Sequence, residues 1–239
     1  MNEPDNQVFN AAASESAEVY GGYPVLLPGQ RAPEYERLWD PVFHAKLPSV
    51  TTAWHGRRFG RRRDTAAAPE TVIAKSVFAA FALDWLVARY APSVVLIERD
   101  PCDVVSSWMR LDFVVGDLAT REPIRSGFVE RLGLPAWDPA APRLLQVAWA
   151  VGVLMSAMRD QSRARPEWKV VSYETLCRDR ATVQGLAASL GLRWSDQAEA
   201  AARHPAEPRN YAQDERRAVA DFLSQFPELA SWFEVESRV

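Results

Sequence analysis

Residues 94–108 read VVLIERDPCDVVSSW, and this stretch decides the fold that the sequence predicts. Four aliphatic side chains followed by a glutamate are typical of a buried strand over 94–98. Asp100, Pro101 and Asp103 then supply an N-cap oxygen, a fixed backbone φ and a negative charge at the start of a helix. The stretch therefore predicts a strand that runs directly into a helix.

The same alternation of strands and helices continues on both sides of this stretch. β-branched runs predict further strands over 71–76 and 168–174, and apolar residues at helical spacing predict helices over 78–89, 144–158 and 214–223. Asp179 and Gly191 are residue types that begin and end a helix. Because strands that alternate with helices form parallel sheets, the predicted fold class is α/β.

The chain is long enough for one well-buried core. Of its 239 residues, 48% are hydrophobic and 25% are charged, which is an ordinary globular composition. We expect a single domain over residues 1–239, with a loop-rich part over 1–70, a core over 71–192 and a helical part over 193–239.

Charge and cysteine content exclude several classes of function. The net charge of −3 and the pI of about 5.7 give no global basic field, so nonspecific binding to nucleic acid or to a membrane surface is not expected. The apolar helix over 144–158 is too short to cross a bilayer and is predicted to be a buried core helix. Cys102 and Cys177 lack the spacing of a zinc site or a disulfide framework, and the first ten residues lack the features of a secretory signal. A cytoplasmic protein is therefore predicted.

Arg99 stands at the carboxyl end of the predicted strand over 94–98, the edge at which open parallel sheets bind ligands. In one interpretation, Arg99 only balances the three acidic residues around it. In the other, Arg99 and Ser107 lie on one side of the helix start, since Ser107 follows Asp103 by one helical turn. A guanidinium group and a hydroxyl group beside a helix N-terminus would form a phosphate clamp.

The run RDPCDVVSS over 99–107 resembles the 3′-phosphate-binding segment of sulfotransferases, the enzymes that use 3′-phosphoadenosine 5′-phosphosulfate as donor. The pattern in that family is Arg, Asp or Asn, Pro, any residue, Asp, three residues and Ser, and every defined position matches. The resemblance implies that Arg99 and Ser107 hold the 3′-phosphate of this co-substrate.

Two further blocks resemble the same family in order and spacing. VVSYETLCRDRATVQGLAASLGL over 170–192 is similar to the block in which a tyrosine lies near the adenine, which implies that role for Tyr173. IAKSVFAAFALDWL over 73–86 is similar to the strand and helix that precede the arginine motif. That match implies that Lys75 lies near the transferred group.

The fold that the resemblance implies is a P-loop-NTPase-like parallel sheet flanked by helices. The donor loop of the family, a strand followed by a sequence similar to Arg/Lys-Ser-Gly-Thr-Thr-Trp, does not occur, so the first strand and the phosphate loop are expected to be missing. Residues 3–6, Glu-Pro-Asp-Asn, resemble the segment that follows this loop in relatives. Three explanations stay open: the true start lies upstream, the amino-terminal stretch substitutes for the strand, or the chain is a degenerate member.

Catalysis in this family needs a base for the acceptor proton and cations for the charge on the sulfuryl group. Glu3 matches the place of the base in some branches; the alternative is a solvated acid near the chain end. Lys75 would contact the sulfuryl or bridging oxygen. Arg209 lies where relatives keep a basic loop over the 3′-phosphate. No metal is expected.

We therefore expect a sulfotransferase-like protein that transfers a sulfuryl group from 3′-phosphoadenosine 5′-phosphosulfate to a hydroxyl or amine of a small-molecule acceptor. The alternative is a truncated or degenerate, non-catalytic relative that only binds adenosine 3′,5′-bisphosphate or a partner. The sequence predicts neither the acceptor nor the oligomeric state.

Overall fold

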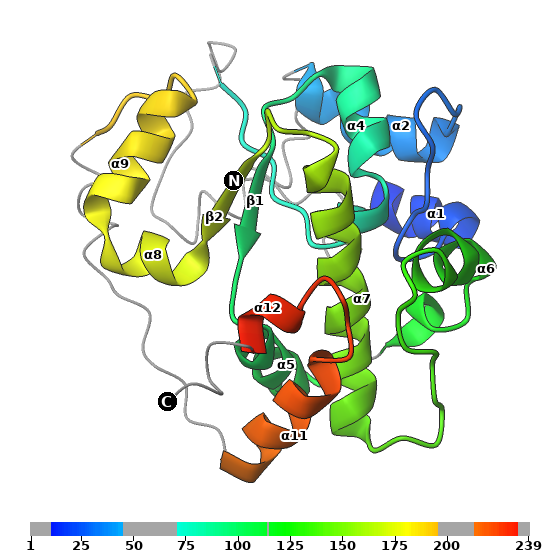
Figure 1. Ribbon diagram of the computed structural model, residues 1–239. Coiled ribbons are helices and arrows are strands. Elements are labelled where there is room, and N and C mark those ends of the chain that lie inside the picture. Colours follow the sequence, from blue (N-terminus) through cyan, green and yellow to red (C-terminus); the bar gives the residue numbers. More distant parts are fainter. Residues whose placement is uncertain (1–10, 45–70, 114, 196–212, 234–239) are drawn as a thin grey trace. The chain divides into compact units, whose positions relative to one another are not determined.

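The computed structural model describes residues 11–44, 71–113, 115–195 and 213–233 (Figure 1). Its fold class is α/β, with mostly helices and a small parallel sheet, as the alternating sequence pattern predicts. The chain divides into two compact units, Met1–Pro92 and Ser93–Val239. Each unit is described by itself, and the single domain expected from the sequence stays a prediction.

The first unit has an aromatic core between its helices. These helices are α1 (Ala11–Tyr20), α2 (Pro33–Phe43), the 3-10 turn η1 (Ala79–Phe81) and α4 (Leu83–Tyr90). The rings of Tyr35 and Trp85 lie with their centroids 5.3 Å apart, and both side chains are buried. The indole Nε1 of Trp85 donates a hydrogen bond to the Gln30 carbonyl oxygen at 2.7 Å. Aromatic packing thus holds together a unit that the sequence alone presents as rich in loops.

The predicted strand over 71–76 is wrong, because this segment contains a single bridge residue, Ala74. The hydroxyl group of Ser76 accepts hydrogen bonds from the backbone N–H groups of Phe78 and Ala79, at 3.1 and 2.9 Å. A serine that accepts from residues two and three positions ahead turns the chain into a helix. The apolar segment therefore leads into η1 and α4 and does not extend a sheet.

The second unit is built around two parallel strands. Strand β1 (Val95–Glu98) pairs with β2 (Lys169–Ser172), with Val95 opposite Lys169 and Glu98 opposite Ser172. The crossover between them contains α5 (Pro101–Arg110), η2 (Gly116–Leu118), α6 (Glu122–Ile124), the π-helical η3 (Arg125–Glu130) and α7 (Arg143–Arg163). Because the strands are parallel, their carboxyl ends meet at one edge of the sheet.

Helix α7 forms the core of the second unit. Residues 147–157 are all buried, which confirms the prediction of a buried core helix over 144–158. Helices α5 and α11 (Gln213–Leu223) pack on α7 (Figure 1). Among the described residues, no helix combines the length and apolarity needed to cross a membrane.

The chain after β2 turns at once into helices. Strand β2 ends at Ser172, two residues before the predicted end, and α8 (Tyr173–Arg178) begins there because the Ser172 hydroxyl group accepts a hydrogen bond from the backbone N–H of Thr175. Helix α9 (Arg180–Ser189) follows. Its N-cap is Asp179, and Gly191, at φ 67°, ends it, as predicted. The last described helix is α12 (Ala230–Phe233).

Candidate functional site

The junction between β1 and α5 has the local structure that the sequence predicts. Asp100 is the N-cap of α5, and its carboxylate accepts a hydrogen bond from the backbone N–H of Asp103 at 3.2 Å. Pro101 occupies the first turn, where its missing N–H costs nothing. The cap fixes where the helix begins and so places Arg99 at the edge formed by the carboxyl ends of the strands.

Arg99 connects this junction to the end of β2. Its Nη2 donates to the Asp103 carboxylate at 3.3 Å, and its guanidinium carbon lies 4.9 Å from the centroid of the Tyr173 ring. Tyr173 is the first residue of α8, directly after β2. The structure thus brings together Arg99 and Tyr173, two of the residues that the sequence analysis assigned to one ligand.

Glu174 ties the two strand-to-helix junctions to each other. Its Oε1 accepts a hydrogen bond from the backbone N–H of Asp100 at 3.1 Å, and its Oε2 accepts one from the Ser172 hydroxyl group at 2.8 Å. One carboxylate therefore holds a backbone group of the first junction and a side chain of the second. This fixes the separation of α5 and α8 where Arg99 and Tyr173 meet.

Arg216 of α11 completes the cluster, and sequence reasoning did not find it. Its Nη2 donates to Asp100 at 2.6 Å and its Nη1 to Asp103 at 3.4 Å. The amphipathic pattern of α11 offers one signal, because Arg216 shares the inward face with Val219. Nothing in the sequence names its partners, which lie more than a hundred positions earlier.

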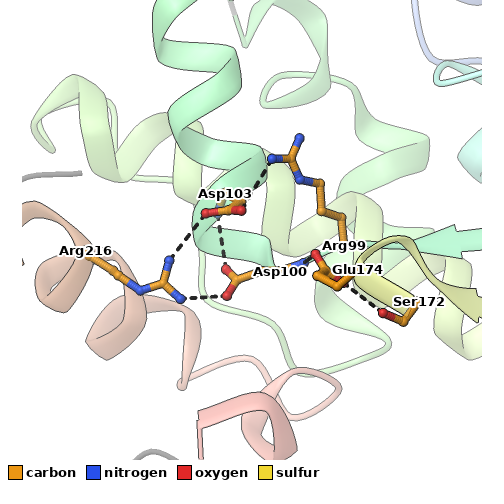
Figure 2. A network of polar contacts seen from close by, with 6 residues as sticks. All are labelled: Arg99, Asp100, Asp103, Ser172, Glu174 and Arg216. Carbon is orange, nitrogen blue, oxygen red and sulfur yellow. Dashed lines mark hydrogen bonds and ion pairs between the residues drawn. The ribbon is translucent and has the colours of Figure 1, made fainter. Parts of the chain in front are cut away.

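Figure 2 shows these side chains together. We call the six residues drawn there the polar cluster: Arg99, Asp100, Asp103, Ser172, Glu174 and Arg216. Two guanidinium groups and three carboxylates leave it one formal negative charge. An anion that binds here therefore competes with Asp103 for the Arg99 guanidinium group.

The acidic residues around Arg99 are divided among three arginines. Arg159 of α7 pairs with Glu98 through Nε and Nη2, at 2.6 and 2.9 Å, and Arg216 pairs with Asp100. Arg99 therefore balances the charge of Asp103, as the first interpretation states, whereas Arg159 balances the charge of Glu98. A fifth of the Arg99 side chain stays exposed to solvent, with 20% relative accessibility.

The remaining predicted site residues are spread over the chain. Ser107 lies on α5 one turn after Asp103 and is partly exposed, and its convergence with Arg99 stays a prediction. Lys75 is exposed and belongs to the first unit. Glu3 and Arg209 lie outside the described residues.

Within the ranges that the structure describes, His, Cys, Asp and Glu side chains form no group that could hold a metal ion. The expectation of a metal-free protein stays a prediction.

Comparisons of the chain with protein-family models, with curated proteins and with solved structures gave no match.

Proposed function

We propose that the chain is a sulfotransferase-like protein that binds the 3′-phosphate of 3′-phosphoadenosine 5′-phosphosulfate at the β1–α5 junction. Arg99 and Ser107 hold the phosphate, and Tyr173 lies near the adenine. The finer fold that goes with this proposal is a P-loop-NTPase-like parallel sheet flanked by helices.

The observation that carries the proposal is the contact between Arg99 and Tyr173. The guanidinium carbon lies 4.9 Å from the ring centroid, at the shared edge where β1 and β2 end. The two residues come from separate sequence blocks, and the resemblance assigns both to one nucleotide. Ligands of open parallel sheets bind at this edge.

The chemistry of the edge suits a phosphate group. An anion gains from the positive end of the α5 dipole and from the planar fork of an arginine. Arg99 and Asp103 make a single long contact of 3.3 Å, whereas a phosphate can accept two parallel hydrogen bonds from the guanidinium fork. The phosphate would therefore replace Asp103 as the partner of Arg99.

Transfer of the sulfuryl group would need residues besides the phosphate clamp. In the proposed reaction, Glu3 takes the proton from a hydroxyl or amine of a small-molecule acceptor, and Lys75 steadies the charge on the sulfuryl oxygens. Arg209 would add a further cation near the 3′-phosphate. The second candidate function is binding of adenosine 3′,5′-bisphosphate without transfer. It is favoured by the fact that the contact between Arg99 and Tyr173 brings together residues assigned to nucleotide binding only.

Isothermal titration calorimetry with adenosine 3′,5′-bisphosphate tests the proposal. The unmodified chain should bind, and Arg99→Ala should lower the affinity by about ten- to a hundredfold, because one charge-assisted contact is lost. Arg110→Ala, at the exposed far end of the same helix, is the matched control and should bind normally.

A second ligand separates the role of the 3′-phosphate from general binding. Adenosine 5′-monophosphate lacks the 3′-phosphate, so the unmodified chain and Arg99→Ala should bind this ligand with equal affinity. Equal affinity of the unmodified chain and Arg99→Ala for the bisphosphate would refute the proposal. If the bisphosphate binds through Arg99, a second assay distinguishes transfer from binding alone. It measures the release of bisphosphate from the phosphosulfate donor in the presence of a pool of hydroxyl and amine acceptors.

A further inference from the structure

We propose that Arg216 is a positioning residue for the phosphate site: it neutralises Asp100 and Asp103, which allows Arg99 to exchange Asp103 for an anion. The inference rests on the proposed function and adds to it a role for the helix α11. Arg216 acts through the two carboxylates and needs no contact with the ligand.

The carboxylate of Asp103 contacts two arginines at once. One oxygen, Oδ2, accepts from Arg99 at 3.3 Å, and the other, Oδ1, accepts from Arg216 at 3.4 Å. Figure 2 shows the Asp103 carboxylate between the two guanidinium groups. When Arg99 turns to a phosphate, Asp103 therefore keeps a cationic partner.

Arg216 also changes the charge balance at the proposed phosphate site. A phosphate on Arg99 lies next to the Asp103 carboxylate, and like charges at this separation repel each other. Arg216 offsets this repulsion, and through its 2.6 Å contact it also offsets the charge of Asp100. Without Arg216, the polar cluster carries two formal negative charges instead of one, and Asp103 holds Arg99 more firmly.

Arg216 extends from a helix that packs on two others. Arg216, Val219 and Leu223 occupy positions i, i+3 and i+7 of α11, so they share one face. Val219 and Leu223 are fully buried, and α11 packs on α5 and α7. Apolar packing thus fixes the helix from which the Arg216 side chain extends, independently of its ion pairs.

The test compares two neighbouring arginines by calorimetry with adenosine 3′,5′-bisphosphate. Arg216→Gln should lower the affinity about tenfold, and Arg216→Lys should restore part of it because it keeps the charge. Arg217→Gln removes an equal charge from the next, exposed position and should bind as the unmodified chain does. The thermal midpoint of each variant shows that α11 stays folded.

A double substitution decides whether Arg216 acts through Asp103. In an Asp103→Asn background, Arg216→Gln should lower the affinity by no more than about threefold, because the carboxylate that competes with the phosphate for Arg99 is gone. A loss that stays tenfold in this background overturns the positioning role. The positioning role is also overturned if Arg216→Gln binds the bisphosphate normally while Arg99→Ala binds it more weakly. If the unmodified chain binds no bisphosphate, or if Arg99→Ala binds normally, the proposed function itself fails, and the inference falls with it.

Discussion

The carboxylate of Asp103 serves three purposes at once. It places negative charge in the first turn of α5, it pairs with Arg99, and it pairs with Arg216. The first purpose is local and is readable from the spacing of Asp100, Pro101 and Asp103. The other two depend on where a neighbouring side chain and a distant helix lie, so the sequence suggests a cap and the structure reveals a shared ion pair.

Tyr173 offers a test of the contact that supports the phosphate site. The Tyr173→Phe variant keeps an aromatic face for the Arg99 guanidinium group, and Tyr173→Leu removes it. A cation–π contact at a partly exposed site is worth about 0.5–1 kcal/mol. We expect Tyr173→Leu to weaken bisphosphate binding about two- to fivefold by calorimetry, and Tyr173→Phe to bind nearly as the unmodified chain does. Equal binding by Tyr173→Leu would contradict this role.

Asp179 gives a prediction for the pH dependence of α9. Hydrogen bonds from the Thr182 hydroxyl group, then from the backbone N–H groups of Ala181 and Thr182, hold the pKa of this carboxyl below its ordinary value of 3.8. The lowered pKa means that the cap contributes stability above the pKa of the unfolded chain. That contribution is lost as the pH falls through the lowered value in the folded chain.

The measurement is a carboxyl titration by NMR together with amide exchange in α9. The Asp179 carboxyl should titrate below pH 3.8. The Asp179→Asn variant keeps an N-cap oxygen that does not titrate, so its α9 should show a weaker loss of protection in acid. A titration midpoint at or above the ordinary value would contradict the prediction.

At the scale of elements, the packing of α11 against α7 decides which side chains can occupy their interface. Gly152 lies in the buried stretch of α7, and the Phe226 ring that follows α11 rests against it. A Cβ atom at position 152 would come within 2.5 Å of that ring. Helix propensity therefore favours alanine at position 152, whereas packing favours glycine.

A pair of glycine substitutions separates the two demands. Gly152→Ala should destabilise the fold by about 1–3 kcal/mol, because the new methyl group overpacks the interface with Phe226. Gly185→Ala, in α9, meets no atom within 4 Å and should stabilise the fold by up to about 1 kcal/mol. Denaturant unfolding measures both. A stabilising effect of Gly152→Ala would show that Phe226 does not pack as the structure has it.

At the scale of the whole molecule, the second unit joins three distant segments at one site. β1 and α5 supply Arg99 and two carboxylates, β2 and α8 supply Tyr173 and Glu174, and α11 supplies Arg216. A ligand that binds at this site should stabilise all three segments. The stabilisation should therefore extend to residues that do not contact the ligand.

Hydrogen exchange measures this coupling. With adenosine 3′,5′-bisphosphate at about a hundred times its Kd, the gain in stability is about 2.7 kcal/mol. We expect slower amide exchange in residues 95–110, 169–178 and 213–223. A gain confined to α6 and η3, which contribute nothing to the polar cluster, would place the ligand elsewhere.

Much of the second unit could be predicted from the sequence. The start of α5 at Asp100–Pro101, the buried helix over 144–158 and the cap of α9 all follow from patterns within a few residues. In the first unit, the strand expected over 71–76 is wrong, and the reason is equally local. Ser76 captures two backbone N–H groups, and this local signal outweighed the β-branched residues before it.

By itself, the sequence determined the α/β class, the helix that follows β1 and the presence of Arg99 at the end of that strand. These features depend on the nearest neighbours along the chain. Only the tertiary structure decided that Tyr173 faces Arg99, that Glu174 links two junctions and that Arg216 shares Asp103. The physical reason is that the partner of a charged or aromatic side chain is set by how helices and strands pack. The periodicity of a helix or strand predicts which of its faces is buried, but it does not predict which residues contact that face.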